Sequence, residues 1–142
     1  MRRISWATSE ESLLLRVNPK TNLIDERIKV GKNPRFLTTG EGAVWTLNQA
    51  EGNVTRIDPK TNKVVATIEL GVPGGGGEIS TGDGAVWVTV FEIPITRIDV
   101  ETNKVTQQWV GPGGDAIRYG LGSVWLSNLR EQNVWRLNPK LF

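Results

Sequence analysis

The stretch Ala43–Gly71, AVWTLNQAEGNVTRIDPKTNKVVATIELG, decides the fold, because its main features occur again before and after it at a nearly constant interval. Each unit closes on a glycine, and Gly31, Gly71 and Gly111 lie 40 residues apart. Two further markers step by 38 to 42 residues: the arginines Arg16, Arg56, Arg97 and Arg136, and the tryptophans Trp6, Trp45, Trp87 and Trp125. A period near 40 with several short strand patterns per unit is typical of a β-propeller blade.

The local pattern within one unit predicts strands and tight turns. Residues 43–47, 53–58 and 63–70 are rich in β-branched and aromatic residues, and the last two segments alternate apolar with polar positions. Between them, DPKTN at 58–62 places proline and asparagine where a turn tolerates them, and 99–103 is similar. No segment has helical periodicity with caps at both ends. We therefore expect an all-β chain of four-stranded antiparallel repeats.

Composition excludes several classes of function. The formal charge is only +2 and is spread along the chain, so we expect no nucleic-acid partner. The chain has no cysteine and no histidine, which removes thiol chemistry, the usual general base and the commonest metal ligand. No stretch approaches the roughly 20 apolar residues of a membrane span, and no apolar run follows Arg2 and Arg3 as in a secretory signal. We expect a soluble chain with no membrane partner; its compartment stays open.

The repeat resembles a known family. GAVWV at 84–88, VTRIDPKTNKVVATI at 54–68 and the closing VG at 30–31 are similar to repeats of the YVTN and virginiamycin B lyase-like (streptogramin lyase-like) β-propellers. The likeness covers nearly the whole chain. It implies blades whose strands run A, B, C, D from the channel outward, six to eight blades per ring, and permits a periplasmic or secreted parent protein.

Applying that strand order predicts fourteen strands in one propeller-repeat domain, residues 1–142. Residues 1–31 supply a partial blade with strands B, C and D, 32–71 and 72–111 supply two blades, and 112–142 supply a partial blade with strands A, B and C. This incomplete ring of three and a half to four blades cannot close alone, and its open faces would expose apolar side chains. We therefore predict self-association, as a homodimer closing an eight-bladed ring, or pairing with a complementary half propeller.

The resemblance places the usual ligand pocket on the face that carries the D-to-A and B-to-C connections. Four charged residues there lie in aligned columns in which at least one other repeat has a small, apolar or uncharged residue: Arg35, Glu78, Asp115 and Arg118. One interpretation is that they converge at the channel mouth on a polar ligand or a divalent cation, Mg or Ca, with Glu78 and Asp115 as candidate metal ligands. The other is that they are solvated loop charges or ion pairs between blades. The tryptophans Trp45, Trp87 and Trp125 share one strand register, which predicts an inter-blade core.

Three functions are consistent with these patterns. The first is a non-catalytic scaffold or binding module, which requires nothing that the chain lacks. The second, implied by the resemblance, is a lyase that opens a cyclic depsipeptide by elimination with Mg and a histidine base; without histidine, the lyase residues cannot be transferred to this chain. The third is a metal-dependent lactonase, with Glu78, Asp115 and Asn128 as possible ligands.

Overall fold

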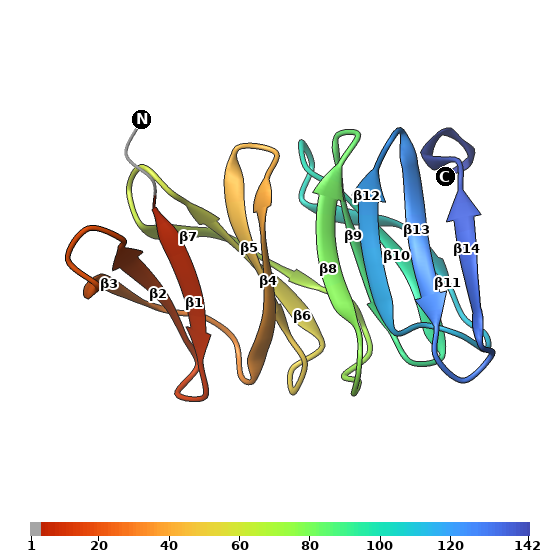
Figure 1. Cartoon of the computed structure of the whole chain (residues 1–142), viewed down its shortest axis with the longest axis horizontal. Coiled ribbons are helices and arrows are strands. Elements are labelled where there is room, and N and C mark those ends of the chain that lie inside the picture. The colour runs from red at the N-terminus through yellow and green to blue at the C-terminus, as the bar shows by residue number, and fades with distance from the viewer. Residues whose placement is uncertain (1–3) are drawn as a thin grey trace.

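The computed structural model describes residues 4–142 and contains fourteen strands in four antiparallel sheets. The sheets follow one another in a row, with β1–β3 at one end and β12–β14 at the other (Figure 1). A short 3₁₀ helix, Pro139–Leu141, follows the last strand. The predicted fold class, all-β blades in an incomplete ring, is confirmed. Arg2 and Arg3, used in the argument against a signal segment, lie outside the described residues.

Each sheet is a meander of consecutive strands joined by hairpins, so its strand order is its sequence order. The first sheet contains β1 (Ser5–Ser9), β2 (Leu13–Asn18) and β3 (Leu23–Lys29). The second contains β4 (Pro34–Gly40), β5 (Ala43–Asn48), β6 (Asn53–Asp58) and β7 (Lys63–Glu69). The third contains β8 (Glu78–Gly82), β9 (Ala85–Val90), β10 (Ile93–Asp99) and β11 (Lys104–Trp109). The fourth contains β12 (Ala116–Gly120), β13 (Ser123–Asn128) and β14 (Asn133–Leu137).

The turn between the last two strands of each of the first three sheets has a local chemical cause. After β6, the Asp58 carboxylate accepts a hydrogen bond from the backbone N–H of Lys60 at 2.8 Å. The N–H of Asn62 then donates to the Asp58 carbonyl at 2.9 Å, and Asn62 has φ +58°, a left-handed conformation that asparagine tolerates. Asn22 and Asn103 have φ +56° and +55° in the corresponding turns. One turn design therefore serves three sheets.

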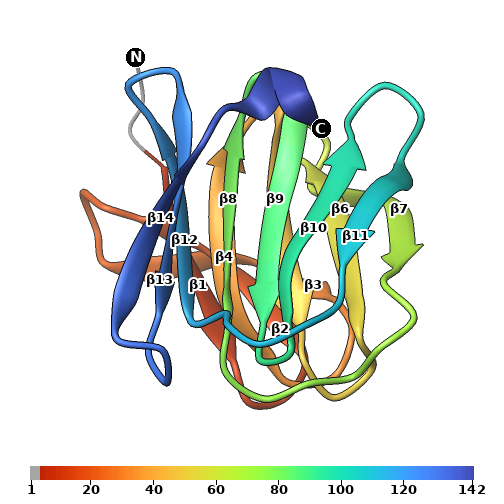
Figure 2. The same ribbon diagram turned by 90° about the vertical axis from the view of Figure 1, so that its right-hand side faces the viewer.

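The sheets pack face to face, and the apolar side chains of neighbouring sheets form the core between them. Trp45 and Trp87 are fully buried, each with its indole N–H donating to a glycine carbonyl at 3.0 Å. Trp125 makes the same bond at 3.1 Å but is only half-buried, because no sheet covers its face in the described residues. Figure 2 views the row from the end that carries this last sheet.

The innermost strands of neighbouring sheets lie side by side, β4 against β8 and β8 against β12. The predicted charged residues fall on or beside these three strands. Within the described residues, no helix is both long and apolar enough to cross a membrane.

Candidate functional site

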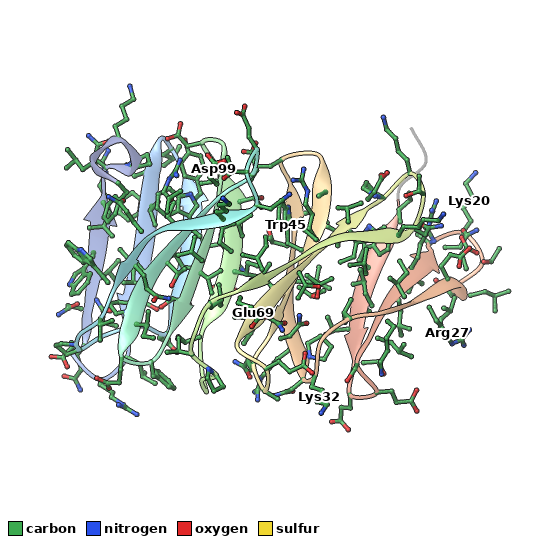
Figure 3. All side chains as sticks on the ribbon, turned by 180° about the vertical axis from the view of Figure 1, so that it is seen from behind. Lys20, Arg27, Lys32, Trp45, Glu69 and Asp99 are labelled. Atoms are coloured by element: carbon green, nitrogen blue, oxygen red, sulfur yellow. The ribbon has the colours of Figure 1, made fainter. Side chains whose placement is uncertain are left out.

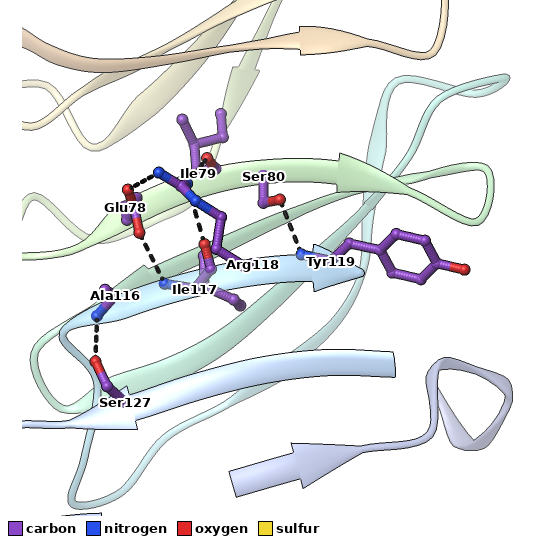
Figure 4. A network of polar contacts seen from close by, with 8 residues as sticks. All are labelled: Glu78, Ile79, Ser80, Ala116, Ile117, Arg118, Tyr119 and Ser127. Atoms are coloured by element: carbon purple, nitrogen blue, oxygen red, sulfur yellow. Dashed lines mark hydrogen bonds and ion pairs between the residues drawn. The ribbon is translucent and has the colours of Figure 1, made fainter. Parts of the chain in front are cut away.

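Glu78 and Arg118 form the centre of the charged cluster, at the contact between β8 and β12 (Figure 4). Glu78 Oε1 lies 2.5 Å from Arg118 Nη2, and Glu78 Oε2 accepts a hydrogen bond from the backbone N–H of Ile117 at 3.1 Å. The Glu78 side chain is 17% exposed and that of Arg118 is 63% exposed. The Glu78 carboxylate therefore connects two strands that belong to different sheets, and the Arg118 guanidinium lies on the solvent side of that carboxylate.

A second polar contact of the same kind lies beside the first. Ser80 Oγ accepts a hydrogen bond from the backbone N–H of Tyr119 at 3.0 Å, two residues along both strands (Figure 4). Glu78 and Ser80 thus satisfy alternate backbone donors of β12, as a neighbouring strand would do in a sheet. The cluster joins two blades.

The structure does not bring all four predicted charged residues together. Asp115 lies at the start of β12, where its carboxylate accepts a hydrogen bond from Ser127 Oγ at 3.3 Å. Arg35 is exposed on β4, with its guanidinium carbon 5.9 Å from the ring centroid of Phe36. Glu78 and Arg118 pair with each other, and neither Arg35 nor Asp115 has an ion pair within residues 4–142.

The proposed metal ligands have other contacts in the structure. Among residues 4–142, no three Asp or Glu side chains are grouped closely enough to hold a metal ion. Asn128, the third residue considered for a lactonase site, accepts a hydrogen bond from the Gly114 N–H and donates to Asn133 Oδ1, both at 2.8 Å. Asn128 is buried and its amide holds the loop before β12 in place.

The polar contacts that repeat from sheet to sheet involve the periodic arginines instead. Each arginine lies over the tryptophan of its own sheet, with the guanidinium carbon 4.9 to 6.0 Å from the ring centroid. Figure 3 shows Trp45 between the sheets, whereas Lys20 and Arg27 extend outward from the first sheet.

Two of these arginines also donate hydrogen bonds to residues of the next sheet. Arg16 Nη1 donates to Asn62 Oδ1 at 2.7 Å, and Arg56 Nη1 donates to Asn103 Oδ1 at 2.7 Å and to the Val100 carbonyl at 2.6 Å. Sequence reasoning used these arginines only as period markers and missed the contact. The available signal was an asparagine six residues after three of the four arginines.

Comparison with solved structures identifies the class of fold. The chain is similar to the hydrazine synthase of Kuenenia stuttgartiensis, with a TM-score of 0.71 and 13% identity over 95% of this chain and 46% of that one. It is similar to apo AztD of Citrobacter koseri, with a TM-score of 0.66 and 13% identity over 80% of this chain and 34% of that one. It is also similar to the computationally designed Ika4 protein, with a TM-score of 0.77 and 12% identity over 97% of this chain and 88% of that one. No protein-family model and no curated protein matches the sequence.

These similarities show a β-propeller-type fold and nothing finer. The chain spans less than half the length of the hydrazine synthase and AztD chains. Fold, strand order and sheet packing therefore define a β-propeller-type chain, and its function is a matter for proposal.

Proposed function

We propose that this chain is a β-propeller scaffold whose row of four sheets closes into a ring by association with another chain. The main support for the proposal is a set of side chains at equivalent positions in the four sheets, each two residues before the periodic arginine. Leu14, Val54 and Ile95 occupy the same position in three successive sheets, facing the next sheet, and are 0 to 1% exposed. Val134 is the corresponding residue of the last sheet and is 64% exposed. Within the described residues, no further sheet packs against the last sheet, so Val134 is exposed at a position that is buried in the other three sheets.

The first sheet has the complementary feature. Ile57 and Ile98 face the preceding sheet and are fully buried, whereas Val17, in the same column of the first sheet, is only half-buried. Its cross-strand neighbour Ile24 is 38% exposed. Covering one such aliphatic side chain contributes roughly 1.5–3 kcal/mol, so both end faces favour association.

The charged cluster supports a scaffold function rather than a reactive centre. Glu78 and Arg118 are paired across two blades, and the remaining oxygen of Glu78 is bonded to the Ile117 backbone. These contacts stabilise the joint between blades. Ika4, whose structure is similar over 97% of this chain and 88% of that one, is a designed protein of comparable length that has itself been crystallised.

Light scattering on a sizing column tests this proposal. We expect a discrete species at twice the 15.7 kDa chain mass. A folded monomer at every concentration tested would overturn the proposal, because the end faces would then be stable in water without a partner.

A further inference from the structure

The contact between each arginine and the next sheet follows a rule that can be extended to the end of the row. Arg16 of the first sheet bonds the turn of the second sheet through Asn62, and Arg56 of the second bonds the turn of the third through Asn103. In both cases the donor is Nη1, the acceptor is an asparagine Oδ1, and the distance is 2.7 Å. In both joints, the periodic arginine of one sheet donates a hydrogen bond to the turn between the last two strands of the next sheet.

Arg97 of the third sheet shows what happens when the asparagine is missing. Phe142 stands six residues after Arg136, where the other repeats have asparagine, and its ring packs edge-on against Trp87 with 5.9 Å between centroids. Arg97 Nη1 turns instead to Thr106 Oγ1 in its own sheet, at 2.9 Å. Its Nε is buried without a hydrogen-bond partner. Where the following turn has no asparagine, the arginine therefore makes no hydrogen bond to the next sheet and its Nη1 bonds within its own sheet.

Arg136 of the fourth sheet has no following turn in the described residues. It stacks on Trp125 at 5.4 Å, and its Nε donates to Ser123 Oγ at 3.0 Å. Arg136 also lines an open pocket of about 390 Å³. The pocket is lined by Gly122, Ser123, Arg136, Asn138 and Lys140. In the second sheet, the corresponding arginine, Arg56, is occupied by the turn of the third sheet.

The first sheet carries a turn of the required kind. Asn22 has φ +56°, and its N–H donates to the Asn18 carbonyl at 2.8 Å, as Asn62 and Asn103 do to the residues four before them at 2.9 and 3.0 Å. Asn18 Oδ1 accepts from the Lys20 N–H at 3.0 Å, as Asp58 does from Lys60. Within residues 4–142, no arginine reaches Asn22 Oδ1. The chain therefore has the acceptor turn at one end and the arginine pocket at the other.

We infer that the Arg136 pocket of one copy receives the Asn18–Asn22 turn of a second copy, with Arg136 donating to Asn22 Oδ1. This inference rests on the proposed ring closure and names its partner and its recognition contact. The joint repeats the contacts that the chain already makes twice internally. Two copies joined head to tail in this way contain two identical joints, one at each end of the row, and close a ring of eight sheets.

Matched variants test the contact separately from association itself. Asn22→Gly keeps the positive φ available and removes the acceptor oxygen, and Arg136→Ala removes the donor. Because a hydrogen bond to a charged group shifts an equilibrium about tenfold or more, and the dimer has two joints, each variant should raise the dissociation constant about a hundredfold. Sedimentation equilibrium measures this constant, and circular dichroism checks that each variant is folded. An unchanged dissociation constant in both variants would overturn the inference.

Two controls use the internal copies of the same chemistry. Asn62→Gly makes the same change in an equivalent turn whose arginine belongs to the same chain, so it should lower stability and leave the dissociation constant unchanged. Arg130→Ala removes an exposed arginine at the same end of the row, where it pairs with Glu92 at 2.6 Å, and should also leave association unchanged. A loss of dimer in either control equal to that of the test variants would contradict the specific contact.

Mixing the two test variants determines whether the two residues meet. In a mixed dimer of Arg136→Ala with Asn22→Gly, one joint is intact and the other lacks both groups. If Arg136 and Asn22 bond each other, removing both costs no more than removing one, so the mixed dimer should be about tenfold or more tighter than either variant alone. Equal affinities would overturn the contact. A wild-type chain that stays monomeric would instead overturn the proposed ring closure, whereas a wild-type dimer insensitive to both variants overturns only this contact.

Discussion

The periodic arginine makes two interactions that a lysine could not make together, stacking on a tryptophan and hydrogen bonding to the next sheet. Its flat guanidinium lies over the tryptophan of its own sheet, and one edge of the same plane donates to the carbonyl and amide oxygens of the next turn. Stacking and directed hydrogen bonding are both properties of the planar fork. Arg56 shows the full set, with the ring of Trp45 at 4.9 Å and two acceptors in the third sheet.

Comparing Arg56→Ala with Arg97→Ala should separate the two contributions. Arg56→Ala loses the stack and both hydrogen bonds to the next sheet, so we expect the free energy of unfolding to fall by about 2–3 kcal/mol. Arg97→Ala loses a stack and one exposed bond but also removes a buried Nε without a partner, so we expect a loss of about 1 kcal/mol or less. Urea unfolding measures both. Equal losses would mean that the crossing bonds contribute nothing to stability.

The outer turns give the molecule a predictable acid response. The backbone N–H of Lys60 lowers the pKa of Asp58, and the backbone N–H of Thr102 lowers the pKa of Asp99, in both cases by bonding the ionised form. A lowered folded pKa contributes stability above the ordinary value of about 3.9, and this contribution is lost as pH falls through the folded pKa.

We therefore expect Asp58→Asn/Asp99→Asn to weaken the acid dependence of the thermal midpoint. Asparagine keeps an acceptor oxygen, and Asn18 and Asn138 hold the same position in the other sheets, where each accepts from a backbone N–H at 3.0 Å. Thermal melts between about pH 6 and pH 2 measure the midpoint of wild type and variant. If the two curves fall in parallel below about pH 4, these carboxylates are not a source of the acid response.

At the scale of elements, the joint between β8 and β12 depends on side chains because the two strands belong to different sheets. Glu78 supplies an acceptor to the Ile117 N–H and a charge to Arg118. Since Arg118 is largely exposed, its ion pair contributes little, whereas a backbone N–H without an acceptor is costly.

The loss of stability in three variants should follow the difference between the backbone hydrogen bond and the exposed ion pair. Glu78→Ala should cost about 1–3 kcal/mol, whereas Glu78→Gln and Arg118→Ala should each cost less than about 1 kcal/mol. Hydrogen exchange gives a local readout: the Ile117 amide should lose protection in Glu78→Ala and keep it in Glu78→Gln. Greater loss of stability in Arg118→Ala than in Glu78→Ala would show that the charge pair, not the backbone bond, holds the joint.

The strands could be predicted from the sequence, because the patterns that specify them are local. Alternating apolar residues, the DPKTN-type turn and the 40-residue period predict the strands, and the structure contains all fourteen. The pairing of Glu78 with Arg118 was less accessible. It depends on how closely two innermost strands approach, and that distance is set by the packing of whole sheets. The charges alone left two interpretations open, four residues converging at one place or solvated charges and ion pairs between blades, and the fold pairs Glu78 with Arg118.

At the scale of the whole molecule, the row has two unlike ends, and the proposed ring closure predicts that stability depends on protein concentration. If the end faces cover each other only in an assembly, folding and association are linked, and the thermal midpoint must rise with protein concentration. Val134 is the most direct residue to change, because its 64% exposure contrasts with full burial of its counterpart Val54.

Val134→Lys should abolish the rise of the midpoint with concentration and leave the strands intact. A charge at the centre of the joint would have to be buried without a partner, and each dimer would contain two of them. In a dilute solution, where wild type is dissociated, the variant should melt close to wild type, because Val134 already faces water there. Val65→Lys is the matched control, since Val65 is 54% exposed on the outermost strand of the second sheet, away from both end faces. Differential scanning calorimetry over a hundredfold range of concentration makes the comparison. A midpoint of wild type that does not move with concentration, or a variant midpoint that moves as much as wild type, would show that the face carrying Val134 is not the joint.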